Sequence, residues 1–122
     1  MKEQVTRVYG SDGEWLEISE DSVIIGFCER TLDQIGNVER IELPEVGKEV
    51  VQGEALVLLE SGKAAYEYVS PVSGRIYAVN QDLSASLDLL QNFPESKGWI
   101  ICLNNVSEED RRRLIHETEL RQ

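Results

Sequence analysis

The chain has 122 residues and a mass of 13.8 kDa, which is the size of one small domain and leaves no room for a second, catalytic domain. Hydrophobic residues make up 41% and charged residues 29%, a balance that is typical of a globular chain and too apolar for a disordered one. The formal net charge of -11 repels phosphate backbones and anionic lipids, so nucleic acids and membranes are not expected as partners. Basic patches on other proteins are favoured instead.

Targeting signals and cysteines indicate a compartment. No apolar run reaches the roughly 18 to 20 residues that a membrane span needs, and the start, MKEQVTRVYG, lacks the apolar core of a secretory signal. We expect a cytoplasmic protein, or one of the mitochondrial matrix if a transit segment was removed. Cys28 and Cys102 are then expected to be reduced and buried. The single histidine, His116, excludes a histidine-rich metal site and most catalytic triads, and we expect it on a solvated helix.

The first part of the chain predicts short strands around one short helix. Residues 14–18 alternate after an Asp12-Gly13 turn signal, and residues 22–27 form a β-branched and aromatic run, so both are expected to be strands. A helical pattern over residues 31–35 ends at Gly36, a suitable C-cap. Residues 38–43 predict a further strand, which ends before Pro44 because proline cannot donate to a central ladder.

Two similar segments follow, residues 44–61 and 70–83, each with a proline, a glycine and a β-rich run. They are connected by ESGKAA at residues 60–65 and by a short strand at 66–69. We expect two sheets linked by this hairpin. The predicted fold is mainly β, a flattened barrel-sandwich hybrid with the hairpin at one end.

The last third mixes irregular chain with one strand and one helix. Residues 83–97 are polar and contain Pro94, so at most one helical turn is expected there. The apolar run at residues 99–103 predicts a strand buried on both faces. Ser107 is a good N-cap for a helix over about residues 108–120, whose thin apolar face predicts packing at the edge of the barrel.

Lys63 stands out at the predicted hairpin tip, flanked by Gly62, Ala64 and Ala65. A lysine in a turn is usually a solvated surface residue. However, small neighbours also leave its amine accessible to a modifying enzyme, and acylation would turn it into a swinging arm. The nine glycines are dispersed, so the sequence has no glycine-rich phosphate-binding loop. The many carboxylates are expected to be solvated surface residues, and no arrangement of residues typical of an active site is found. We therefore do not expect an enzyme.

Three stretches of the sequence carry a resemblance to a known family: LPEVGKEV, LLESGKAAYEYVSPVSGRIYAVN and FPESKGWI. Together they strongly resemble the H protein of the glycine cleavage system, a family of lipoyl carriers. In this chain Lys63 takes the position of the modified lysine, residues 70–74 the Ser-Pro turn, and Asn80 the end of the next strand. The pairs Glu14-Trp15 and Gly98-Trp99 also match. The resemblance predicts a single lipoyl-carrier domain over residues 1–122, with a core at about 12–103 and a C-terminal helix within 107–120.

What the family does implies a cofactor and partners for this chain. Lipoate would be attached covalently to Lys63 by a lipoate ligase or an octanoyltransferase. The arm would carry the aminomethyl group of glycine between a pyridoxal phosphate glycine decarboxylase, an aminomethyltransferase and dihydrolipoyl dehydrogenase. The chain would be a non-catalytic carrier subunit, because the chemistry belongs to the cofactor and the partner enzymes. We expect a monomer.

The resemblance also suggests roles for single residues. Glu60 and Gly74 would help to position the hairpin for the ligase, and Gly74 is expected to supply the positive φ of a β-turn. A loaded arm ends in an amine, which nearby carboxylates would hold by charge-assisted hydrogen bonds. Glu14 is the first candidate for this contact, followed by Glu67, while Gln34 on the short helix is expected to line the same groove.

Two departures from the family leave other functions open. Gly13 stands where the family usually has histidine, and Gly62 stands where an apolar residue usually precedes the lysine. The chain could therefore carry lipoate for another pathway, by lipoyl relay or redox chemistry, or act as an unmodified scaffold. A biotin carrier is disfavoured because that family flanks its lysine with methionines, and this chain has only Met1.

Overall fold

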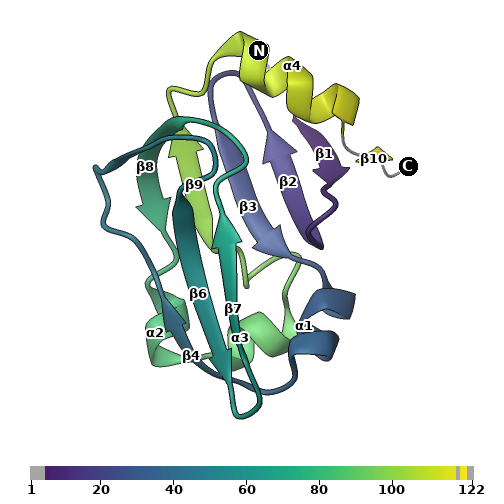
Figure 1. The fold of residues 1–122 in the computed structure, drawn as a ribbon, viewed down its shortest axis with the longest axis vertical. Helices are drawn as coiled ribbons and strands as arrows, with labels where there is room; N and C mark the ends of the chain where they lie inside the picture. Colours follow the sequence, from purple (N-terminus) through teal and green to yellow (C-terminus); the bar gives the residue numbers. More distant parts are fainter. Residues whose placement is uncertain (1–4, 118, 121–122) are drawn as a thin grey trace.

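A computed structural model describes residues 5–117, 119 and 120 of the chain (Figure 1). The strands are β1 Thr6–Tyr9, β2 Glu14–Ile18, β3 Val23–Phe27, β4 Val38–Glu42, β5 Glu49–Val50, β6 Ala55–Ser61, β7 Ala65–Val69, β8 Gly74–Val79, β9 Ile101–Asn104 and β10 Glu119–Leu120. The helices are α1 Glu29–Ile35, α2 Asp82–Ala85, α3 Asp88–Asn92 and α4 Glu108–Glu117. All of these strands pair in an antiparallel manner.

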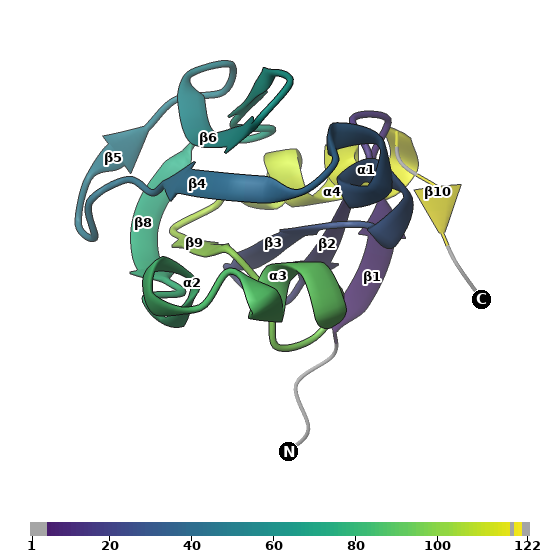
Figure 2. The same cartoon turned by 90° about the horizontal axis from the view of Figure 1, so that it is seen from below.

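The strands form two sheets. Seven strands lie in the order β10-β1-β2-β3-β9-β8-β5, and three lie in the order β4-β6-β7. Figure 2 shows the smaller sheet as one layer above the layer that contains β1, β2, β3 and β9, with the short helices α2 and α3 at one side. The predicted mainly β architecture, with a short helix near residues 31–36 and a C-terminal helix, is confirmed.

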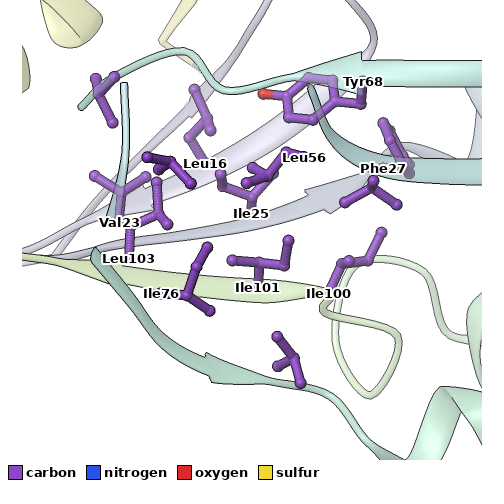
Figure 3. Packing of buried hydrophobic residues seen from close by; sticks show 14 of the residues in the cluster. Leu16, Val23, Ile25, Phe27, Leu56, Tyr68, Ile76, Ile100, Ile101 and Leu103 are labelled. Atoms are coloured by element: carbon purple, nitrogen blue, oxygen red, sulfur yellow. The ribbon is translucent and has the colours of Figure 1, made fainter. Parts of the chain in front are cut away.

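The core lies between the two sheets. Strand alternation turns every second side chain inward, so Leu16 and Ile25 of the larger sheet face Leu56 and Tyr68 of the smaller one (Figure 3). Each such side chain contributes about 1.5 to 3 kcal/mol by leaving water. The cluster extends to Leu32 of α1 and Leu114 of α4, which attaches both helices to the sandwich.

Local sequence signals predicted the ends of several strands and helices to within two residues. Strand β2 spans the predicted residues, and β3 begins one residue later than predicted. Helix α1 begins two residues earlier than predicted, at Glu29, and ends before Gly36, whose φ of 93° is left-handed. Strand β4 ends at Glu42, before Pro44. Residues 82–92 contain two short helices, α2 and α3, rather than one turn.

The prediction that the hairpin links the two sheets was wrong. Strands β6 and β7 pair with each other inside the three-stranded sheet. A tight turn keeps its two strands adjacent, whereas a crossing between sheets must span about 10 Å of core. After the hairpin, the chain returns to the larger sheet at residues 70–73, between β7 and β8. The hairpin does lie at one end of the molecule, as predicted (Figure 1).

The C-terminal helix is shorter than the predicted 108–120. It ends at Glu117, and Glu119–Leu120 form β10, which pairs with β1 at Tyr9 and Val8. Thr118 lies outside the described residues. Because Leu114 is the one buried residue of α4, there is little apolar contact to prolong the helix, and sheet pairing takes over. The predicted cap is present, since the Asp110 amide donates to Ser107 Oγ at 3.1 Å.

The expectation that residues 99–103 are buried on both faces was also wrong. Ile101 and Leu103 are buried, but Trp99 and Cys102 are only half-buried on the outer face of the larger sheet. Cys28 is half-buried too, and no disulfide occurs in the part of the chain that the structure describes. Among the described helices, none is long and apolar enough to cross a membrane. His116 is exposed on α4.

Candidate functional site

The β6–β7 turn presents Lys63 to solvent. Glu60 pairs with Ala65 at the end of the ladder, and the Ser61 amide donates to the Ala64 carbonyl oxygen at 2.9 Å. Ser61 Oγ accepts hydrogen bonds from the amides of Lys63 and Ala64, both at 3.3 Å, which closes the turn without using the lysine side chain. Lys63 is exposed, and no ion pair among the described residues involves it. Its amine is therefore accessible to a modifying enzyme.

A groove of about 540 Å³ lies beside this turn. Three segments form its walls: the turn with the start of β7, the loop between β1 and β2, and helix α1, which lies next to the hairpin end in Figure 1. The lining residues are Ser11, Asp12, Gly13, Arg30, Thr31, Gln34, Ile35, Lys63, Ala64, Ala65 and Tyr66. The structure thus brings Lys63 and Gln34 together, two of the six residues that the sequence singled out.

Helix α1 is fixed to the β1–β2 loop at Gly13. The Gly13 carbonyl oxygen accepts hydrogen bonds from Thr31 Oγ1 at 2.9 Å and from the Cys28 amide at 3.0 Å. Gly13 has a φ of 82°, and a Cβ added there would lie 2.0 Å from Thr31 Oγ1. Only glycine fits this close approach. The departure from the family at residue 13 therefore has a structural reason in the contact with Thr31.

Two tyrosines of β7 tie the smaller sheet to the same loop. Tyr66 donates its hydroxyl hydrogen to the Asp12 carbonyl oxygen at 2.9 Å, and Tyr68 donates to Glu14 Oε2 at 2.6 Å. Both rings meet the edge or face of Phe27 in T-shaped contacts, with centroids 5.7 and 5.4 Å away. The hairpin that carries Lys63 is therefore held at a fixed distance from the larger sheet.

The environment keeps both tyrosine hydroxyls protonated. Burial raises the pKa of Tyr68 well above its ordinary value, and the charge of Glu14 raises that pKa further. Burial also raises the pKa of Tyr66, with smaller contributions from the charges of Asp12 and Glu14. Both groups thus remain hydrogen-bond donors through the neutral pH range.

Glu14 lies beneath the groove and not in its wall. Glu14 is only 4% exposed. Its Oε1 accepts a hydrogen bond from the Asp12 amide at 3.1 Å, and its Oε2 accepts one from the Tyr68 hydroxyl. The carboxylate also rests directly against Gly10, where an added Cβ would lie 2.2 Å from Oε1. Both oxygens are therefore engaged within the protein. The structure does not bring Glu14 to the surface where an arm would lie.

Glu67 and Glu60 are on the hairpin but outside the groove lining. Glu67 is exposed on β7, and strand alternation puts it on the opposite face from Tyr66 and Tyr68. Glu60 faces solvent from β6 and pairs with Arg40 Nη1 at 3.1 Å. The arm-contact role of Glu67 and the ligase role of Glu60 remain predictions.

Gly74 lies at the end of the hairpin strands remote from Lys63, where β8 begins (Figure 1). Its φ is not positive, so the expectation of a left-handed turn residue was wrong. A Cβ at this position would lie 2.9 Å from the Asn104 carbonyl oxygen and 3.2 Å from Val106 Cγ2, and this close approach is what requires glycine. The structure does not bring Gly74 to the lysine, and its role in ligase recognition remains a prediction.

Other residues of the matched motifs hold the scaffold together. Trp15 is buried, stacks over the space that a side chain at Gly26 would fill, and donates from Nε1 to the Pro94 carbonyl oxygen at 2.9 Å. Asn80 donates from Nδ2 to the carbonyl oxygens of Lys97 and Trp99 at 2.9 and 2.8 Å. These contacts close the loop that leads into β9.

Sequence reasoning did not assign Arg30, Thr31 or Tyr66 to the groove. The signal for Tyr66 was available, since Tyr66 and Tyr68 alternate in a strand directly after the lysine and so share a face. Arg30 and Thr31 could not be found in this way, because the position of α1 beside the hairpin depends on tertiary contacts.

Comparisons with known proteins agree on one family. The family model described as glycine cleavage H-protein matches residues 7–122. A glycine cleavage system H protein of Deinococcus deserti is 42% identical over 109 residues, which are 89% of this chain and 88% of the relative. One from Listeria monocytogenes serotype 4b (strain CLIP80459) is 35% identical over 108 residues, 88% of this chain and 86% of the relative. The crystal structure of a glycine cleavage system H protein from Mycobacterium marinum matches with a TM-score of 0.75 and 28% identity, over 84% of this chain and 87% of that chain.

Proposed function

Because the chain belongs to the glycine cleavage H-protein family, we propose that it is a lipoyl carrier with the lipoyl group attached to Lys63. The observation that carries this proposal is the position of Lys63, exposed at the turn of a hairpin that two tyrosine hydroxyls fix to the larger sheet. A carrier needs an amine that a modifying enzyme can reach, and a rigid scaffold that holds this amine in a fixed place.

The residues around Lys63 suit a lipoyl group. Gly62, Ala64 and Ala65 leave the amine sterically accessible, and the neighbouring groove offers Ile35 and the Tyr66 ring as apolar surface for an aliphatic arm. When bound, the lipoyl group supplies a redox-active disulfide that can accept and release a transferred group. The chain itself holds the turn through Ser61 and positions the groove wall through Tyr66.

The finer proposal is that the arm carries the aminomethyl group of glycine. Its partners would be a pyridoxal phosphate glycine decarboxylase, an aminomethyltransferase and dihydrolipoyl dehydrogenase, after loading by a lipoate ligase or octanoyltransferase. Membership of a family named for glycine cleavage supports this set. The chain would act as a monomeric, cytoplasmic, single-domain carrier over residues 1–122 and would have no catalytic role of its own.

One observation favours a second candidate, a lipoyl carrier for a different cargo. Glu14, the residue expected to hold the amine of a loaded arm, is buried and bonded to Tyr68, while Arg30 lines the groove. A cationic cargo gains nothing from either residue in this arrangement.

Intact mass spectrometry after co-expression with a lipoate ligase tests the attachment site. We expect one lipoyl group on the wild-type chain, none on Lys63→Arg, and one on the matched control Lys97→Arg. A lipoyl group on Lys63→Arg would show that another lysine is used, and an unmodified wild-type chain would favour the scaffold alternative.

Glycine–bicarbonate exchange with a glycine decarboxylase then separates the two cargo proposals. We expect the lipoylated wild-type chain to support exchange and the lipoylation-deficient Lys63→Arg chain to fail. A lipoylated chain that supports no exchange would leave the carrier role intact and overturn the glycine cargo.

A further inference from the structure

The face of the larger sheet that points away from the smaller sheet carries a second groove, of about 400 Å³. We call it the outer groove, and its walls and floor are formed chiefly by Arg7, Trp15, Glu17, Ile24, Tyr77 and Trp99. We propose that the outer groove docks a partner protein, through a segment of that partner in which arginine side chains stand beside aliphatic ones. No described residue lines both this groove and the one beside Lys63, so a partner held here leaves the lysine turn free.

Strand pairing assembles the floor of the outer groove from four strands. Glu17 of β2 pairs with Ile24 of β3, Ile24 pairs with Cys102 of β9, and Cys102 pairs with Ala78 of β8. Side chains alternate across a sheet, so these residues point outward while Ile25, next to Ile24, is buried in the core. Ile24, Cys102 and Ala78 are each half-buried. The registers therefore lay a continuous apolar strip across the outer face.

Aromatic side chains form the walls of the outer groove. Trp15 lies flat over Gly26, where an added Cβ would lie 2.4 Å from the ring, and Trp99 is half-buried. Tyr77 is 63% exposed on β8. The register shift in β8 next to Tyr77 lets this residue and Ala78 line the groove together. Exposed aromatic rings beside an apolar floor are typical of the residues that dominate binding between proteins.

The charges at the outer groove favour a cationic partner. Of the described residues that line it, Arg7 is the only cation, and the carboxylates of Glu17 and Glu95 both pair with it, at 3.0 and 3.2 Å. Two carboxylates against one guanidinium leave one negative charge in excess, on a chain whose net charge is -11. A second copy of this chain would bring the same excess, so charge repulsion opposes pairing between copies.

Arg7 shows within this chain the chemistry that we propose for the partner. Its guanidinium carbon lies 4.2 Å from the centroid of the Trp15 ring, while its Nε and Nη2 donate to Glu17. Arginine suits such a site because it stacks on aromatic faces and bonds carboxylates at the same time. Among the described residues, no cation lies over the ring of Tyr77 or Trp99. These rings can receive an arginine of the partner, and an aliphatic neighbour would cover the apolar floor.

Peptide titration of the unmodified wild-type chain tests the proposal. Three capped peptides of equal length are compared: one of alternating arginine and leucine, one with glutamate in place of arginine, and one with serine in place of leucine. Amide NMR signals of residues 24, 77, 78, 99 and 102 report binding, and those of residues 61–66 report on the lysine turn. We expect saturable shifts at the outer groove with the arginine–leucine peptide, an affinity about fivefold weaker for the arginine–serine peptide, and no saturation with the glutamate peptide. The signals of the lysine turn should not change.

Variants of the groove sharpen the comparison. Tyr77→Ala should weaken the arginine–leucine peptide about threefold to tenfold, whereas Val51→Ala, at a residue that is also 63% exposed but lies outside the outer groove, should leave its affinity unchanged. Glu17→Gln should weaken it about twofold to fivefold. Glu109→Gln is the matched control, because it removes the same charge from an exposed position on α4.

The peptide comparison uses the wild-type chain, so it decides the matter even if a variant fails to fold. Equal affinities for the arginine and glutamate peptides would overturn the proposed charge preference, and equal affinities for the leucine and serine peptides would overturn the role of the apolar floor. Shifts of the same signals with protein concentration alone would overturn the proposal in favour of a second copy of the chain. None of these results depends on lipoylation of Lys63, so the docking face and the carrier role stand or fall separately.

Discussion

The two ends of the three-stranded sheet differ in how tightly their turns are packed, although each turn lies near a glycine of the stretch that carries the family resemblance. At one end, the turn after β6 leaves Lys63 exposed and is closed by the backbone and the hydroxyl of Ser61. At the other end, the turn after β7 is packed into the core: Ser70 is 1% exposed and donates from Oγ to the Val72 carbonyl oxygen at 2.7 Å, and Val72 is fully buried. The motif glycines follow this division, since Gly62 lies near only the exposed side chain of Glu39, whereas Gly74 packs against the Asn104 backbone.

This difference explains how a small domain can present a reactive side chain at a defined place. The anchored end fixes the strands, and the two tyrosine bonds fix their height above the larger sheet. The free end then carries a lysine whose backbone is ordered while its side chain is not used by the fold.

The sharpest way to test this division is to place the same side chain at both ends. Gly74→Val should lower the free energy of unfolding by about 3 kcal/mol, because the new Cβ would meet the Asn104 backbone oxygen, which cannot move cheaply. Gly62→Val should change it by no more than about 0.5 kcal/mol, because the nearest atom, Glu39 Oε2 at 3.3 Å, ends a flexible exposed side chain. Urea denaturation measures both, and equal losses would remove the distinction between the two ends.

The tyrosine bonds give the next largest effect. Tyr68→Phe should cost about 2 kcal/mol, since it removes a hydrogen bond to a buried charged group and leaves one Glu14 oxygen without its donor. Tyr66→Phe should cost only about 0.5 to 1 kcal/mol, because its bond to the Asp12 carbonyl oxygen lies at the groove surface and water can replace it. Urea unfolding curves of the two variants measure both losses of free energy. A larger loss for Tyr66→Phe would mean that the groove contact anchors β7.

The comparison of the two ends also shows which features could be predicted from the sequence: local ones could, and contacts between distant residues could not. Strand β2, helix α1 with Gly36, and the turn at Lys63 were predictable because alternation, helix period and turn residues are local. The contact that buries Glu14 was not, because it joins residues 54 positions apart. Gly74 shows the same limit, since its need for glycine arises from β9 and not from its own turn.

The chain ends show a second limit of sequence reasoning. Strands β1 and β10 lie in charged segments without clear alternation, and they exist because they pair with each other and with β2. Two-residue and four-residue strands gain their stability from partners in the sheet rather than from propensity. The helix α4 accordingly stops earlier than its own pattern predicted.

Alkaline pH should weaken the anchored part more than the free turn. The pKa of Tyr68 is raised in the folded chain above its ordinary value of about 10. Its contribution to stability is therefore complete below about pH 10 and is lost as the pH rises towards the folded value, by up to about 1.4 kcal/mol per pH unit. The free energy of unfolding should fall more steeply above pH 10 in the wild-type chain than in Tyr68→Phe. Parallel curves would show that other groups, such as Tyr66, account for the dependence.

The smallest effect on stability is expected at Glu60, next to the free turn. Its ion pair with Arg40 joins side chains that are 37% and 63% exposed, so Glu60→Gln and Arg40→Gln should each change the free energy of unfolding by less than about 1 kcal/mol. Both variants break this pair, and Arg40→Gln also removes the exposed ion pair of Arg40 with Glu42, but only Glu60→Gln removes the carboxylate that the family resemblance assigns to ligase recognition. Lipoylation rates should therefore fall for Glu60→Gln and stay near wild type for Arg40→Gln. Equal slowing in both would indicate that the ligase depends on the pair and its effect on the turn, and an unchanged rate in Glu60→Gln would remove Glu60 from ligase recognition altogether.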